Sequence, residues 1–258
     1  MRTTHPTREQ SALHHDHVTP FGLEHRRSLQ RPLSIDGIES TFLEGLAPSE
    51  RNAVVKAASY RRFSQTSVPA HEREPANHFF LLLRGSARFY FITPSGRQVY
   101  LLWLAPGDIF GGATLLPEPS TFLVSTEVAK EAHVLVWTRE VIRTLAQRHS
   151  RLFENLLAIT HEYILWYLGT HSSLVSHTAR QRLANVLLSL TRGRGQGPVL
   201  RVPLEITNEQ LANTANITQF TVSRLLSEWR RSGAITKTRG KILVTRPEIL
   251  KSASDALR

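Results

Sequence analysis

The segment from Ile206 to Leu226 constrains the fold more than any other part of the chain, because it predicts two short helices joined by a tight turn. Thr207 precedes the first helical run and Gln210 follows three residues later, which is the spacing of a capping box. Asn216 lies in the predicted turn and tolerates a left-handed backbone. Thr218 is a favourable N-cap for the second helix. The segment therefore predicts a helical hairpin of the kind that places one helix in the major groove of DNA.

The second helix has one apolar and one polar face. The apolar residues recur at helical spacing and predict a buried stripe of Val222, Leu225, Leu226 and Trp229. On the open face, glutamine can bond adenine, arginine can bond guanine in bidentate fashion, and phenylalanine can touch a thymine methyl group. A helical hairpin with a merely solvated polar face is the alternative. The predicted DNA-binding residues of this helix are Thr218, Gln219, Phe220, Thr221, Ser223, Arg224 and Ser227.

A basic hairpin follows the predicted helices. Residues 234–237 and 241–244 read as short strands, and Gly240 completes the turn between them. Arg239 and Lys241 are expected to reach DNA phosphates, although an ordinary basic surface hairpin has the same composition. The order of helices and hairpin predicts a winged helix-turn-helix.

The charge distribution favours a polyanionic partner. The chain carries 32 Lys and Arg against 21 Asp and Glu, and residues 173–258 hold 14 of the basic and 5 of the acidic residues. The excess positive charge therefore lies in the C-terminal third, which suits double-stranded DNA. No apolar run approaches the length of a membrane span and no signal peptide is recognised, so we expect a cytoplasmic protein without a membrane partner.

Two features limit the metal chemistry. The absence of cysteine excludes disulfides and a cysteine-held iron–sulfur cluster. Residues 1–33 form a polar tail that we expect to be disordered. The tail is rich in histidine, but the irregular spacing argues against a metal site. Its histidines are His5, His14, His15, His17 and His25.

The N-terminal half of the chain predicts short strands. Apolar runs between residues 78 and 137 are separated by turns that contain Gly85, Gly96 and Gly107, eleven residues apart. This spacing predicts a small antiparallel sandwich or barrel, and of the two we expect a jelly-roll barrel. The expected fold class is α+β, with a barrel at 34–138, a long helix at 139–172 and the winged helix-turn-helix at 173–258.

Two apolar stripes run along the predicted long helix. The first alternates spacings of four and three, which is typical of a helix that packs against a symmetry mate. A neighbouring stripe of Phe153, Leu157, Ile164 and Leu168 would then cover the barrel, although both stripes facing a single-chain core is the alternative. The predicted dimer interface is Leu152, Leu156, Ile159, Tyr163 and Trp166.

The order of barrel, long helix and winged helix-turn-helix, together with the run from Thr221 to Leu226, resembles the CRP/FNR family of bacterial transcription regulators. The resemblance implies a cyclic-nucleotide-binding type barrel, a homodimer that reads a two-fold DNA site, and RNA polymerase as a partner. It also implies that Arg224 reads a guanine. Phe220 stands where many members have a glutamate, so we expect an altered DNA site.

The cassette that holds a cyclic nucleotide in such proteins is changed here. Gly112 stands where the resemblance implies a glutamate, and residues 122–125 carry no cation where an arginine is implied. Because burial of an unpaired phosphate is costly, cAMP and cGMP are not expected. The alternatives are an apolar or aromatic molecule, haem on His71, His78, His133 or His161, or no small ligand. The predicted effector pocket is Phe89, Phe91, Tyr100, Trp103, Phe122, Leu123, Tyr163 and Trp166.

A metal-dependent cupin-like barrel enzyme fused to a nucleic-acid-binding domain is the alternative function. Such an enzyme needs a His-x-His or His-x-Asp/Glu pair on a strand, and the nearest residues, His71 and Glu72, are adjacent. We therefore do not expect an enzyme. For a regulator, the sequence predicts that effector binding moves the barrel against the long helix and that a hinge at residues 176–178 reorients the recognition helices.

Overall fold

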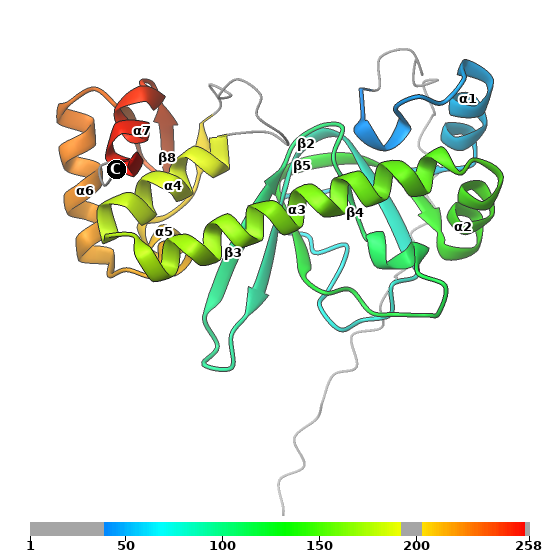
Figure 1. Ribbon diagram of the computed structural model, residues 1–258, viewed down its shortest axis with the longest axis horizontal. Coiled ribbons are helices and arrows are strands. Elements are labelled where there is room, and N and C mark those ends of the chain that lie inside the picture. The colour runs from blue at the N-terminus through cyan, green and yellow to red at the C-terminus, as the bar shows by residue number, and fades with distance from the viewer. Residues whose placement is uncertain (1–38, 192–202, 256–258) are drawn as a thin grey trace, which may run out of the picture. The chain divides into compact units, whose positions relative to one another are not determined.

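The computed structural model describes residues 39–191 and 203–255 (Figure 1). The predicted tail of residues 1–33 and the predicted loop of residues 192–198 lie outside the described residues. A β-rich domain comes first in the chain, followed by long helices and then by small helices with a hairpin. In chain order the elements are η2 (Thr41–Leu43), α1 (Pro48–Lys56), β1 (Ser59–Phe63), β2 (His78–Ile92), β3 (Gln98–Leu104), β4 (Ile109–Phe110), η3 (Gly112–Leu115), β5 (Ser125–Thr138), α2 (Arg139–Arg148), α3 (Arg151–Ser176), α4 (Ala179–Thr191), β6 (Leu204–Glu205), α5 (Asn208–Ala215), α6 (Gln219–Arg231), β7 (Ile235–Thr238), β8 (Lys241–Val244) and α7 (Pro247–Asp255).

The first domain is built on an antiparallel sheet in which β1, β5, β2 and β3 are neighbours in that order, while β4 pairs with β2. Phe80 on β2 lies opposite Val136 of β5 and Phe110 of β4. Together with the helices that follow, this sheet confirms the predicted α+β class.

The predicted turn at residues 84–86 is wrong, because β2 continues through it as one strand of 15 residues. The register against β5 shifts around Arg84 and Ser86, so the segment is a bulge within the strand. Gly85 has φ +86°, and a Cβ atom built on it would lie 2.0 Å from the carbonyl oxygen of Glu131. Glycine therefore serves a close approach of two strands here. The turns predicted near Gly96 and Gly107 are turns in the structure.

The apolar run on β2 is continuous because the strand is buried on both faces. Phe79 and Leu81 pack with Trp137 and the helices α2 and α3, whereas Phe80 and Leu82 pack in a second cluster. The Trp137 indole N–H donates a hydrogen bond of 2.8 Å to the Val54 carbonyl oxygen of α1. The hydrogen bond anchors α1, and the shared cluster with Leu152 and Ile159 places the long helix α3 against one face of the sheet.

The long helical segment is divided, whereas the sequence predicts one helix from residue 139 onward. α2 ends at Arg148, and His149 leaves the helical region with φ −124° and ψ 83°. α3 then extends through Ser176, and His177 is extended before α4 begins at Ala179. The predicted hinge at residues 176–178 thus coincides with a break between two helices.

The C-terminal domain has a core of its own. Helices α4, α5 and α6 contribute to it, together with a small antiparallel sheet in the order β6, β8, β7. Lys237 of β7 lies opposite Ile242 of β8. This arrangement is a helix-turn-helix with a hairpin wing. Within the described ranges, no helix is long and apolar enough to cross a membrane.

Candidate nucleic-acid interface

The turn between α5 and α6 has the local geometry that the sequence predicts. The Thr207 hydroxyl accepts a hydrogen bond of 3.1 Å from the Gln210 backbone N–H, and the Gln210 side chain accepts one of 2.9 Å from the Thr207 N–H. Asn216 adopts the left-handed conformation, with φ +50° and ψ 54°. Thr218 caps α6 by accepting from the Thr221 backbone N–H. These local bonds set the direction in which α6 leaves the turn.

α6 buries one face and exposes the other. Val222, Leu225, Leu226 and Trp229 lie in the domain core, and each is at most 2% exposed. Phe220 is 79% exposed, so its ring is accessible to a partner. Thr221 is half-buried. The other predicted contact residues of this helix are exposed, namely Thr218, Gln219, Ser223, Arg224 and Ser227.

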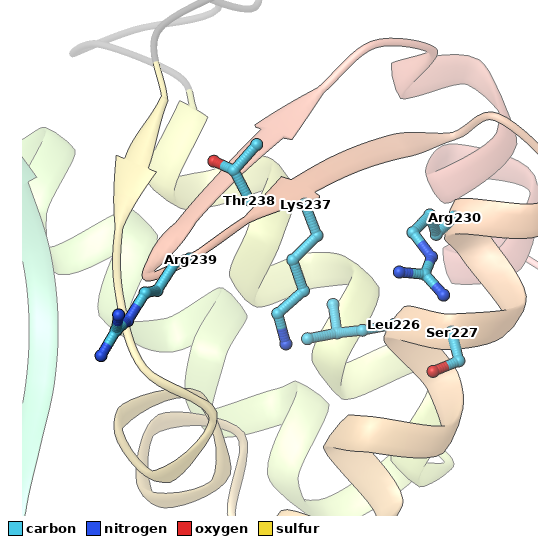
Figure 2. A pocket seen from close by; sticks show the side chains of 6 residues that line it. All are labelled: Leu226, Ser227, Arg230, Lys237, Thr238 and Arg239. Carbon is cyan, nitrogen blue, oxygen red and sulfur yellow. The ribbon is translucent and has the colours of Figure 1, made fainter.

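A basic hollow of about 340 Å³ lies between α6 and the hairpin (Figure 2). Figure 2 shows the Lys237 side chain extending from the hairpin along the hollow, and its amine donates a 2.8 Å hydrogen bond to Oδ1 of Asn208 on α5. Burial lowers the pKa of the Lys237 amine, and the positive charge of Arg230 lowers this pKa further. An anion entering the hollow would relieve this repulsion. The lining residues are Leu226, Ser227, Arg230, Lys237, Thr238 and Arg239.

Two of the basic residues that line the hollow were not among the predicted DNA contacts. Arg230 and Lys237 are on different elements, and no local spacing relates them. Lys241, by contrast, was predicted to contact DNA, but its amine lies 2.9 Å from the Glu205 carboxylate of β6. Arg239 lies in the hollow and is exposed, as a phosphate contact requires.

Arg224 is paired on the surface of α6. Its Nη1 donates a hydrogen bond of 2.9 Å to Oε1 of Glu228, one helical turn later. The other carboxylate oxygen of Glu228 accepts from Nη2 of Arg180, which belongs to α4. Neither of these two ion pairs was predicted from the sequence. The spacing of four residues between Arg224 and Glu228 could have indicated the first of them.

The predicted effector residues do not converge on one cavity. The Phe89 and Tyr163 rings meet edge to face at 6.0 Å, between the sheet and α3. Phe122 is buried in the sheet's second core cluster, while Leu123 is 81% exposed. Trp103 instead packs against the core of the C-terminal domain. Two further predicted residues, Phe91 and Trp166, are half-buried.

Tyr100 belongs to a polar cluster that sequence reasoning missed. The Arg88 guanidinium is 4.3 Å from the Tyr100 ring centre, and its Nε donates a 2.8 Å hydrogen bond to Glu127. The Tyr100 hydroxyl donates to the same carboxylate oxygen and accepts a 3.1 Å hydrogen bond from the Gln210 side-chain amide. Burial raises the pKa of Tyr100 to about 12. Arg88 is therefore a buried cation that already has an anionic partner.

The altered cassette lies directly under α3. A Cβ atom on Gly112 would lie 3.3 Å from Cδ1 of Leu156, which is tight for any side chain. Arg139 donates hydrogen bonds of 2.7 Å to the carbonyl oxygens of Thr114 and Leu116. Arg143 also donates to carbonyl oxygens of this segment, so both arginines next to the cassette are bonded to backbone.

The candidate haem ligands are scattered. His133 contacts the Tyr60 hydroxyl and lies 3.3 Å from Glu131, while His71 and His161 are exposed at separate places. Burial, followed by the charge of Arg61, lowers the pKa of His78. Across residues 39–191 and 203–255, no three His, Cys, Asp or Glu residues are grouped to hold a metal ion.

The two apolar stripes of α3 face in the opposite directions from those predicted. Leu152 and Ile159 are at most 1% exposed and pack in the core under α3, with Leu156 and Tyr163 half-buried against it. The predicted dimer seam therefore covers the chain's own sheet, apart from the half-buried Trp166. The stripe assigned to the barrel is exposed instead: Phe153 38%, Leu157 71%, Ile164 52% and Leu168 55%.

An antiparallel β domain joined through a long helix to a winged helix-turn-helix defines the class of two-domain DNA-binding regulators. Residues 60–149 match the family described as cyclic nucleotide-binding domain, and residues 181–253 match the Crp-like helix-turn-helix domain. The chain belongs to the CRP/FNR family, and it is a DNA-binding transcription regulator rather than an enzyme.

Individual relatives agree with this assignment. The chain is 24% identical to the CRP-like cAMP-activated global transcriptional regulator of Mycobacterium tuberculosis, over 81% of this chain and 94% of that protein. It is 26% identical to the cyclic AMP receptor protein of Thermus thermophilus, over 84% of this chain and 98% of that protein. The solved structure of FixK2 from Bradyrhizobium japonicum shares the fold, with a TM-score of 0.65 and 22% identity, over 78% of this chain and 99% of that one.

Proposed function

We propose that two copies of this chain bind a two-fold DNA site, that α6 of each copy enters the major groove, and that a ligand other than a cyclic nucleotide modulates binding. The exposed polar face of α6 beside the basic hollow carries this proposal. RNA polymerase is the further partner that a transcription regulator of this family would contact in the cytoplasm.

The residue types on α6 allow specific roles. Arg224 would read a guanine, Gln219 an adenine, and Phe220 a thymine methyl group. Arg230 and Arg239 would bind phosphates on either side of the hollow and thereby position α6. Phe220 replaces the acidic residue common in the family, so the preferred half-site would differ at the neighbouring base pair.

The exposed stripe of α3 supports the homodimer. Phe153, Leu157, Ile164 and Leu168 recur at spacings of four and seven, which is typical of a helix seam that packs against a partner helix. A symmetric pair of α3 helices would bury this stripe and place the two copies of α6 about one helical turn of DNA apart.

Charge-removing substitutions in the hollow test the proposed DNA interface. We expect Arg230→Gln to weaken binding to every duplex to a similar extent, because a phosphate contact carries no sequence information. Each lost contact should lower the slope of log affinity against log salt by about 1. Fluorescence anisotropy between 50 and 200 mM salt measures this slope. Lys251→Gln, on α7, is the control with the same charge change, and an identical slope for Arg230→Gln and the unmodified protein would contradict the assignment.

The altered cassette predicts that cAMP has no effect. Relatives carry cAMP in their names, but Gly112 provides no carboxylate where a glutamate is implied, and a Cβ atom there would lie 3.3 Å from Cδ1 of Leu156. A ligand at 100 times its Kd stabilises a protein by about 2.7 kcal/mol, which raises the Tm of a chain of this size by roughly 5–10 °C. We expect 1 mM cAMP or cGMP to leave both Tm and DNA affinity unchanged. A saturable rise in Tm would contradict this expectation.

The effector itself can be identified from the native protein. The effector class that we favour is an apolar or aromatic molecule, because the residues predicted to bind it are mainly aromatic. Mass spectrometry of molecules that co-purify with the protein would identify it, and an absorption spectrum would reveal haem by a Soret band. Effector binding would act through the helix break at residues 176–178.

A further inference from the structure

Glu228 occupies a place on α6 that helix stability does not explain. It lies in the last turn, where a carboxylate faces the negative end of the helix dipole. It also follows Arg224 by four residues, which is the less favourable order for an acidic and a basic residue on one helix. Helix stability therefore does not explain why a glutamate stands here, with an arginine bonded to each of its carboxylate oxygens.

The carboxylate of Glu228 is anchored to the domain rather than to α6 alone. One oxygen accepts from Arg180 of α4, a residue 48 positions earlier in the chain. The Arg180 guanidinium also lies 5.9 Å from the ring centre of Trp229, and Trp229 is buried in the domain core. The Glu228 side chain is 26% exposed, whereas those of Arg180 and Arg224 are 45% and 55% exposed. The least exposed member thus connects the other two.

The Arg224 guanidinium keeps most of its hydrogen-bonding capacity in this arrangement. It has five N–H donors, and Glu228 uses one of them on Nη1. The remaining donors can still make the two parallel hydrogen bonds that guanine O6 and N7 require. The pair with Glu228 restricts the orientation of the guanidinium plane, so less rotamer freedom is lost when DNA binds.

We propose that Glu228 is a positioning residue that orients Arg224 for bidentate reading of guanine, and that Arg180 holds Glu228 in place. This rests on the proposed function, in which Arg224 contacts a base. The negative charge of Glu228 also opposes the phosphate backbone of any duplex, which lowers affinity without regard to sequence. Glu228 therefore increases discrimination by orienting the correct contact.

The variant Glu228→Gln tests this proposal, because glutamine keeps the shape and an acceptor oxygen but loses the charge. Affinity is measured for a selected duplex, for the same duplex with the guanine read by Arg224 replaced by adenine, and for an unrelated duplex. We expect the ratio between the first two affinities to fall about tenfold, within the roughly 5- to 150-fold discrimination of one bidentate pair. Affinity for the unrelated duplex should rise. Glu248→Gln, on α7, is the control and should change neither quantity.

Arg180→Gln provides a second measurement that leaves Glu228 and Arg224 intact. We expect a smaller loss of discrimination in the same direction, with circular dichroism and Tm showing that both variants fold. An unchanged ratio in Glu228→Gln, including an equal rise in affinity for all duplexes, would overturn the positioning role and leave a plain charge effect. If Arg224→Ala discriminates as well as the unmodified protein, the guanine contact in the proposed function fails first, and the role of Glu228 fails with it.

Discussion

Leu157→Glu is expected to convert the proposed dimer into monomers and to lower affinity for a two-fold DNA site by about 100-fold or more. Leu157 is 71% exposed at the centre of the apolar stripe on α3. Two copies of the variant would place two unpaired carboxylates in a buried seam, which is unfavourable. Each monomer would then hold a single half-site, and the gain in affinity from a second linked contact, about 10²–10⁴-fold, would be lost.

Sedimentation or light scattering measures the oligomeric state, and anisotropy on a two-fold duplex measures the affinity. Leu123→Glu is the matched control, because Leu123 is also highly exposed but lies outside α3. The control should remain dimeric. A dimeric Leu157→Glu protein with normal affinity would show that the chain associates through another surface.

Arg224→Ala is expected to reduce affinity for a selected site by about 5- to 150-fold per half-site and to remove the preference for one guanine. The substitution removes the bidentate donor and also leaves Glu228 with one arginine partner. A repelling carboxylate would then face the groove. The loss should therefore exceed that of an ordinary phosphate contact.

Arg246→Ala removes the same charge from the same domain and should keep the preference at every base pair. The comparison requires affinities for the four duplexes that differ at the guanine position. If Arg224→Ala weakens binding to all four equally, Arg224 contacts the backbone and another residue reads the base.

The helix-turn-helix could be predicted from the sequence because local interactions determine it. Thr207 and Gln210 cap each other three residues apart, and Asn216 satisfies the turn with its own left-handed backbone. The buried and exposed faces of α6 follow from the helical spacing of its apolar residues. None of these features depends on a distant part of the chain.

Features that depend on distant contacts could not be predicted. The sequence suggests a turn at Gly85, but the structure places this glycine in a bulge. The close approach of the Glu131 carbonyl oxygen on the neighbouring strand, which leaves no space for a side chain, cannot be seen in the sequence. Heptad spacing on α3 is the same for a stripe that faces a sheet and one that faces a partner, so the pattern could not assign Leu152 and Leu157 to their faces. The link between Arg180 and Glu228 joins two helices that local spacing does not relate.

The residues of the predicted effector pocket do not lie together, for a related reason. Strict alternation would place Tyr100 and Trp103 on opposite faces of β3, but the register against β2 shifts at Phe89 and Tyr90, and the two rings lie 5.4 Å apart. Phe122 belongs to the sheet's second core cluster. Aromatic composition alone does not say which face of a strand each ring occupies. The Arg88–Glu127 pair was equally hidden, since its members lie on different strands.

Selection of duplexes from a random pool, followed by measurement of the protein-to-DNA ratio, tests directly whether paired copies of α6 read DNA. We expect a two-fold symmetric site with half-site centres about 34 Å apart, two chains per duplex, and a guanine in each half that Arg224→Ala no longer prefers. Enrichment of no sequence, or of a single unpaired half-site bound by one chain, would contradict this expectation.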